Sequence, residues 1–287
     1  MTQSSRFLLP DPPEPLAYFE SLVSNDADFA LLEAAVTLGQ QADASLDVQA
    51  VLCEVDRLAD ALRRRLPADA SPTARLRALC RYFFHDLGFA ANLNDFHDPA
   101  NSYLHKVLET RRGIPISLAL LLIELAGQIG LKAQGVSFPG HFLVKLHLPA
   151  GEVVLDPLTG QSLSRAALEE RLQLFQGPSD DTPLGLYLQA ASPREFLARM
   201  LRNLKLIHRQ NGQAQALLAV QQRLVRLLPT DWEERRDRGL VLLELGEPDA
   251  AADDLTVYLQ GRPRATDAAS LLQRLAMLRP ASGPSLH

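Results

Sequence analysis

The chain has only two cysteines in 287 residues, Cys53 and Cys80. Two thiols do not make a disulfide framework, so the sequence excludes the class of small secreted domains held together by disulfides. Both cysteines fall in segments with helical, apolar spacing, and we therefore expect reduced, buried thiols. No Cys/His spacing typical of a zinc site is present.

The sequence also lacks a long hydrophobic run and an excess of positive charge. No apolar run reaches transmembrane length, and residues 1–6 lack the hydrophobic region of a secretory signal. The formal net charge of −5 at pH 7 argues against a general role at nucleic acids or membrane surfaces. We therefore expect a cytoplasmic protein with neither nucleic acid nor membrane as a partner, and no cofactor is indicated.

The first third of the chain has a helical pattern. Apolar residues recur at helical spacing and predict helices at about residues 16–23, 28–38, 47–66 and 71–88. The polar loop at 92–99 contains Asn, Asp and His, which suggests a metal site, but turn formation explains the Asn, Asp and Pro residues without one. We predict no metal.

The most informative stretch is residues 103–160. Residues 116–129 are nearly all apolar, which predicts a buried helix, and Pro115 suits its first turn because a missing N–H costs nothing there. Two short apolar segments at 142–148 and 153–155 flank a Pro-Ala-Gly turn and predict a β-hairpin. The expected order is therefore a buried helix, a strand opening with His141, a turn, and a strand ending at Asp156.

This order resembles the core of the transglutaminase-like cysteine hydrolases. In that family a cysteine lies at the start of the buried helix, a histidine on the next strand and an aspartate on the strand after it. The family's helix start, Gly-x-Cys-x-x-x-Ala, aligns with Gly113-Ile114-Pro115-Ile116-Ser117-Leu118-Ala119. His141 and Asp156 occupy the other two matching positions, and Pro115 stands at the position of the nucleophile.

Proline has no ionisable atom, so Cys–His–Asp chemistry cannot start from this position. Ser117 lies two residues later, about 200° round a helix, and we expect it to face elsewhere. Cys53 and Cys80 would reach the site only through an unexpected fold. His141 and Asp156 keep two interpretations, a structural polar pair or a ligand-binding pair.

A more specific resemblance, over nearly the whole chain, is to the bacterial SirB-type proteins. The signatures that carry it are Arg111-Arg112-Gly113-Ile114-Pro115-Ile116-Ser117-Leu118 and Phe138-Pro139-Gly140-His141-Phe142. The resemblance implies an α+β, mostly helical fold: a papain-like core with a short antiparallel sheet, then an all-α tetratricopeptide stack. We predict domains at 1–185 and 190–287, with a linker at 177–183.

The C-terminal region repeats with a period of 34 residues. At this offset Gly212 falls on Gly246 and Pro229 on Pro263, which is typical of tetratricopeptide repeats. Two repeats plus a closing helix at 267–278 bury little apolar surface, so we expect the stack to pack on the core. Such stacks present a surface for peptides and protein partners, and a helical buttress without a ligand is the alternative.

Four residues around the predicted helix start are candidate binding residues: Asn101, Tyr103, Arg112 and Ser117. Arg112, with its neighbour Arg111, could meet an anionic partner or cap the preceding helix and form local ion pairs.

Two classes of function follow. The first is a non-catalytic regulatory or interaction protein with a degenerate transglutaminase-like domain and a repeat surface for a protein partner. The second is a hydrolase or amidase of altered mechanism that uses His141 and Asp156 without a cysteine nucleophile. A third possibility is a cleft that binds a protein segment or a small amide without turning it over. We favour the non-catalytic class.

Overall fold

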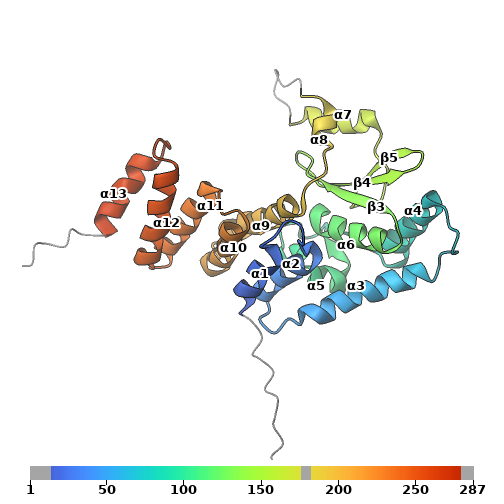
Figure 1. Ribbon diagram of the computed structural model, residues 1–287, viewed down its shortest axis with the longest axis horizontal. Coiled ribbons are helices and arrows are strands. Elements are labelled where there is room, and N and C mark those ends of the chain that lie inside the picture. The colour runs from blue at the N-terminus through green and yellow to red at the C-terminus, as the bar shows by residue number, and fades with distance from the viewer. Residues whose placement is uncertain (1–13, 176–181, 279–287) are drawn as a thin grey trace, which may run out of the picture.

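The computed structural model describes residues 14–175 and 182–278, and these form a mostly helical protein with two small sheets (Figure 1). This confirms the predicted α+β fold class. The predicted linker at 177–183 lies largely outside the described residues, and the predicted domain boundaries stay predictions.

Four helices precede the central stretch, near the predicted ranges: α1 (Pro15–Val23), α2 (Leu31–Thr37), α3 (Val48–Arg63) and α4 (Pro72–Cys80). A 3-10 turn at Leu38–Gln41 extends α2, and a π-helical turn at Arg81–Asp86 extends α4. The side chains of Asp47 and Ser71 accept hydrogen bonds from backbone N–H groups at the starts of α3 and α4. These caps satisfy donors that have no partner in a helix's first turn.

The buried helix is α6 (Pro115–Gln128), with Pro115 at its start. Short elements lead into it: β1 (Ala90–Ala91), the 3-10 helix η3 (Pro99–Ser102), α5 (Leu104–Thr110) and β2 (Arg112–Gly113). Strands β1 and β2 pair in parallel, and this fixes the chain immediately before the α6 N-terminus.

The predicted hairpin is present as β4 (Leu143–Leu148) and β5 (Gly151–Leu155). A third strand, β3 (Lys132–Val136), pairs antiparallel with the other edge of β4. The sequence did not predict β3, because its Lys-Ala-Gln-Gly-Val composition is a weak strand signal. Its glycine is needed for packing: a Cβ at Gly135 would lie 2.7 Å from ring atoms of Phe142 and Phe196.

Two details of the predicted order are wrong. His141 lies in a turn two residues before β4, not at the first residue of the strand, and Asp156 follows the last residue of β5. The turn depends on Gly140, whose φ of +65° is in the left-handed region that favours glycine. Because the backbone turns at Gly140, His141 precedes the strand and does not belong to it.

After the sheet come α7 (Arg165–Gln173) and α8 (Leu184–Tyr187), and then the repeat helices α9 (Pro193–Gln210), α10 (Ala214–Leu227), α11 (Trp232–Glu244), α12 (Pro248–Gly261) and α13 (Ala268–Leu278). The 34-residue period is confirmed, since α12 begins 34 residues after α10 and ends 34 residues after it. Gly212 and Gly246 both have positive φ, +66° and +77°, at the turns between paired helices.

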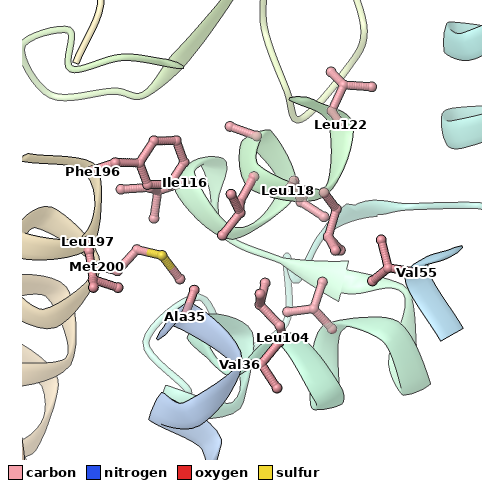
Figure 2. Packing of buried hydrophobic residues seen from close by; sticks show 14 of the residues in the cluster. Ala35, Val36, Val55, Leu104, Ile116, Leu118, Leu122, Phe196, Leu197 and Met200 are labelled. Carbon is pink, nitrogen blue, oxygen red and sulfur yellow. The ribbon is translucent and has the colours of Figure 1, made fainter. Parts of the chain in front are cut away.

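The main hydrophobic core surrounds α6 (Figure 2). Ile116, Leu118 and Leu122 of this helix are almost completely buried. They belong to one cluster with residues of the N-terminal helices, α5 and α9: Ala35, Val36, Val55, Leu104, Phe196, Leu197 and Met200. Helices α9 and α10 are therefore part of the core, whereas the buried residues of α11, α12 and α13 belong to separate clusters. The expectation that the stack packs on the preceding domain holds for its first two helices (Figure 1).

The prediction of two buried cysteines is half wrong. Cys53 is exposed, because it lies about 200° from Val51 on α3 while Val51 and Val55 form the buried face. Cys80 is half-buried against the core, and burial raises the pKa of its thiol. Within 14–175 and 182–278, none of the helices combines the length and apolarity that a bilayer crossing requires.

Candidate functional site

Pro115 and His141 line the same cavity, whose volume is about 180 Å³. Four segments distant in the sequence enclose it: the loop before η3, the start of α6, the turn at 140–142, and helix α9. The described lining residues include no cysteine, serine or threonine: Phe96, His97, Ile114, Pro115, Ile116, Gly140, His141, Phe142, Arg199, Asn203, Leu206 and Ile207.

Pro115 removes two chemical groups from the helix start. A cysteine at this position would supply a thiol, which a helix N-terminus activates by lowering its pKa. It would also supply a backbone N–H, and the N–H of the nucleophile itself is a common donor to the oxyanion of an acyl-transfer intermediate. Proline has neither group. The cavity therefore lacks both the attacking atom and one stabilising donor.

His141 and Asp156 form the predicted pair. His141 Nε2 lies 3.1 Å from Asp156 Oδ1, the Leu158 N–H donates to the same oxygen at 3.0 Å, and Arg171 Nη1 donates to Oδ2 at 3.1 Å. Burial alone would raise the pKa of Asp156, but the hydrogen bonds from His141, Leu158 and Arg171 and the charge of His141 outweigh it and lower the pKa to about 2. Asp156 is therefore a carboxylate at neutral pH.

The carboxylate also determines how His141 can act. A neutral imidazole that donates its Nε2–H to Asp156 carries a lone pair on Nδ1. That nitrogen can accept a hydrogen bond from a ligand or take a proton. The arrangement has the base and its orienting partner, but the structure provides no nucleophile between the base and the α6 N-terminus among the described lining residues.

Arg199 of α9 holds the turn that carries His141. Its Nη1 donates to Ser137 Oγ at 2.6 Å and to the Phe138 carbonyl at 3.1 Å, and Nη2 donates to the His141 carbonyl at 2.8 Å. The guanidinium also lies 5.6 Å from the centroid of the Phe142 ring. Burial lowers the pKa of Arg199. A residue of the first repeat helix thus positions the histidine of the core.

Ser117 faces away from the cavity, as its helical position predicts. Its side chain is fully buried, and its Oγ donates to the Asn101 carbonyl at 2.7 Å and accepts from the Ile114 N–H at 3.1 Å. A Cβ at Gly113 would lie 2.7 Å from this Oγ. Ser117 therefore ties the start of α6 to η3.

The other three candidate binding residues also lie outside the cavity lining. The Asn101 amide donates to the Asp95 carbonyl at 2.7 Å and accepts from Asn92 at 3.1 Å, and so shapes the loop that supplies Phe96 and His97. The exposed Arg112 donates to the Gly88 carbonyl at 2.8 Å. The binding roles of these residues and of Ser117 stay predictions.

Tyr103 connects the core to the first repeat helix. Its hydroxyl lies 3.2 Å from His208 Nε2, and His208 Nδ1 lies 2.7 Å from Gln213 Oε1. Burial raises the pKa of Tyr103 to about 12, so the phenol is neutral. This buried chain of hydrogen bonds places Tyr103 in the packing between the two regions.

Sequence reasoning missed Arg199, Asn203 and Leu206, which lie at helical spacing on α9 and face the cavity. Their segment belongs to the repeat pattern, and nothing in a 34-residue period indicates that one helix also closes a site in the preceding domain. The loop at 92–99 was considered only as a metal site or a turn, although Phe96 and His97 line the cavity. Within the described part of the chain, no three His, Cys, Asp or Glu side chains are grouped as metal ligands.

The facing sides of α9 and α11 are linked by ion pairs. Lys205 Nζ lies 2.5 Å from Glu234 Oε2 and 2.6 Å from Asp237 Oδ2. Arg202 pairs with Asp231 at 2.7 Å and with Glu234 at 2.9 Å. Glu234 and Asp237 are buried, so these charges stabilise the stack internally.

A family model described as the transglutaminase-like superfamily matches residues 49–202, more than half of the chain. This chain belongs to that family. A second model, described as tetratricopeptide repeat, matches residues 204–276. The two matches follow each other along the chain in the order that the sequence motifs predicted.

Similar curated proteins confirm the SirB-type resemblance. A UPF0162 protein of Xylella fastidiosa strain 9a5c is 36% identical over 83% of this chain and 86% of its own length. A UPF0162 protein of Pseudomonas aeruginosa is 34% identical over 90% and 94%. Protein SirB1 of Salmonella typhimurium is 26% identical over 75% and 80%. No solved structure gave a significant match.

Proposed function

We propose that this chain is a non-catalytic, regulatory interaction protein. In this proposal the transglutaminase-like cavity binds without turnover, and the repeats present a surface to a protein partner. Tetratricopeptide repeats in general mediate protein–protein contacts, which supports the second part. The cytoplasmic location predicted from the sequence stays part of the proposal.

One observation carries the proposal: Pro115 lies on the wall of the cavity that His141 faces. Loss of a nucleophile from a catalytic triad costs several orders of magnitude in rate, on the order of 10⁴ to 10⁶. Proline at this position removes an oxyanion donor as well, and such a donor contributes about 10²- to 10³-fold. Acyl-enzyme chemistry at this cavity is therefore not a useful activity for the chain.

The intact His141–Asp156 pair is compatible with a binding role. Asp156 joins the end of β5 to the turn before β4 through His141 and to α7 through Arg171. A buried polar unit with all its partners in place orders the surrounding segments. His141 of this pair also lines the cavity.

The test compares hydrolysis of an activated ester and of peptide amides by the unaltered chain, His141→Ala and His147→Ala, between pH 5 and pH 9. His147 is a matched control because it is an exposed histidine on β4, outside the cavity lining. We expect all three proteins to show the same background rate. Turnover that is lost in His141→Ala and kept in His147→Ala would establish the hydrolase alternative instead.

Pro115→Cys serves as the positive control of this experiment. The substitution restores both a thiol and an N–H at the helix start, next to His141. We expect the introduced thiol to react with iodoacetamide at pH 7 about tenfold faster than the exposed Cys53, and to lose this advantage when His141→Ala is added. Mass spectrometry of each labelled site gives the rates. Equal rates with and without His141 would show that the geometry no longer supports activation.

A further inference from the structure

Arg199 lines two hollows of the protein, a small cavity and a larger groove. It lines the cavity of about 180 Å³ that contains Pro115 and His141. It also lines a larger groove of about 840 Å³, which runs past Ser137 and Gln189 to Arg202, Asp231 and Arg262. The guanidinium-bearing side chain of Arg199 therefore lies beside both.

The charge of Arg199 has no counter-ion in the structure. Its three hydrogen bonds go to a hydroxyl and two carbonyl oxygens, which are neutral. Within residues 14–175 and 182–278, no carboxylate lies within ion-pair distance of it. A guanidinium has five N–H donors, so Nε–H and one N–H of Nη2 are left for a ligand.

The expected intrahelical partner is engaged elsewhere. Glu195 precedes Arg199 by four residues on α9, a spacing that favours an ion pair. Its carboxylate instead accepts from the Ser192 N–H at 2.8 Å and from the Ser192 hydroxyl at 2.9 Å, in the capping box of the helix. The other cations of the groove are paired: Arg202 with Asp231 and Glu234, and Arg262 with Glu233 at 3.4 Å.

The small cavity suits one apolar side chain. Its volume is below the range of about 300–1,000 Å³ that holds drug-sized ligands. Pro115, Ile116, Phe142 and Ile207 supply apolar wall. Two further lining residues, Phe96 and Leu206, are 45% and 53% exposed, so apolar surface of the cavity also faces solvent.

We propose that this cavity receives the C-terminal residue of a polypeptide, with its apolar side chain among Pro115, Phe142 and Ile207 and its α-carboxylate on Arg199. The cavity holds one residue, and its wall carries the unpaired cation of Arg199. The anionic group and the apolar group of the ligand must therefore belong to the same residue. A chain end meets this requirement, and the preceding residues leave along the groove. The inference rests on the proposed function, in which the cavity binds without turnover.

Isothermal titration of the whole chain with five-residue peptides tests the inference. The probes are Gly-Ser-Gly-Ser-Phe and Gly-Ser-Gly-Ser-Leu with free carboxylates, the same two peptides as C-terminal amides, and Gly-Ser-Phe-Glu-Gly amide. We expect the free carboxylates to bind and the amides to bind at least about tenfold more weakly, the usual loss for a charge-assisted hydrogen bond. The peptide with an internal glutamate should bind as weakly as the amides.

Three variants locate the binding. Arg199→Gln should lose the preference for the free carboxylate, and thermal unfolding reports whether it folds. Leu206→Glu should also abolish binding, because it places a competing carboxylate at the rim on a residue that is already more than half exposed. Arg57→Gln is the matched control, since this exposed arginine pairs with Glu54 on its own helix α3 and lies outside both hollows. It should bind like the unaltered chain.

The outcomes separate this inference from the proposed function. Three results would overturn the inference and leave the non-catalytic proposal in place. They are equal binding of the free carboxylates and the amides, binding of the internal-glutamate peptide as tight as that of the free carboxylates, and no binding of any probe at 1 mM. Cleavage of a probe that depends on His141 would overturn the non-catalytic proposal itself. Binding of the free carboxylates that Arg199→Gln and Leu206→Glu abolish would support the inference.

Discussion

Helix α6 of the transglutaminase-like core buries apolar side chains on nearly all sides, whereas helix α11 of the repeats buries carboxylates. Ile116, Leu118 and Leu122 of α6 are almost inaccessible, and so are Glu234 and Asp237 of α11. Packing holds α6 and does not depend on salt or pH. The buried carboxylates of α11 pair with cations of α9, and Val241 and Leu242 of α11 are buried as well. The two regions therefore meet in α9, which packs into the core with one face and pairs with α11 through another.

The two packed faces of α9 determine which of its residues line the cavity. Arg199, Asn203 and Leu206 are on the face of α9 between the apolar face and the ion-paired face. A change in how α11 sits on α9 would act on the same helix that positions His141 through Arg199. Three predictions test whether the two regions are held by the different means that the structure shows.

The largest effect is expected in the core. Leu118→Ala removes a fully buried side chain of the main cluster, to which Leu104 and Val55 also belong, and should lower the free energy of unfolding by about 2–5 kcal/mol. Leu206→Ala, on the exposed side of α9, should change it by less than about 0.5 kcal/mol. Urea denaturation measures both. A small loss for Leu118→Ala would mean that α6 is not the packing centre.

A smaller effect is expected in the repeats. Glu234→Gln removes a buried negative charge that Lys205 and Arg202 both contact, and should cost about 1–3 kcal/mol. Glu233→Gln is the matched control, because the adjacent Glu233 carboxylate is half exposed and, among the residues that the structure describes, pairs only with Arg262. It should cost less than about 1 kcal/mol, and less still in 1 M salt. If the two variants unfold alike, the ion pairs do not hold the stack.

The third prediction concerns pH. The pKa of Asp156 is lowered from 3.8 to about 2 in the folded chain, so its ionised form contributes stability above about pH 4 that is lost as pH falls toward 2. The contribution is about 2 kcal/mol. The difference in unfolding free energy between the unaltered chain and Asp156→Asn should therefore shrink between pH 5 and pH 2. A pH-independent difference for Asp156→Asn would contradict the lowered pKa.

Much of the fold was predictable because it rests on local patterns. The run from Ile116 to Ile129, the hairpin with its Pro-Ala-Gly turn and the 34-residue period each specify an element through spacing alone. Strand β3 was not predictable, since its ladder to β4 and not its composition makes it a strand. The exposure of Cys53 was not predicted, because the helical spacing of its apolar neighbours was taken to imply burial. The side of the helix on which Cys53 lies was not considered.

The sequence predicted only those site residues that belong to the family motif. The motif placed Pro115, His141 and Asp156, and the structure brings Pro115 and His141 to one cavity. It also contained Ser117, whose hydroxyl instead ties α6 to η3. The candidates Asn101 and Tyr103 support the loop and the packing against α9, roles that depend on partners far along the chain.

The sequence alone determined that no thiol stands at the helix start, because the identity of Pro115 is a covalent fact that no folding can change. It also determined the repeat period and the buried helix. Only the tertiary structure decided which residues face His141. Arg199 and Leu206 reach the cavity because α9 packs across the core, and such contacts between distant segments arise from the burial of apolar surface rather than from any local pattern.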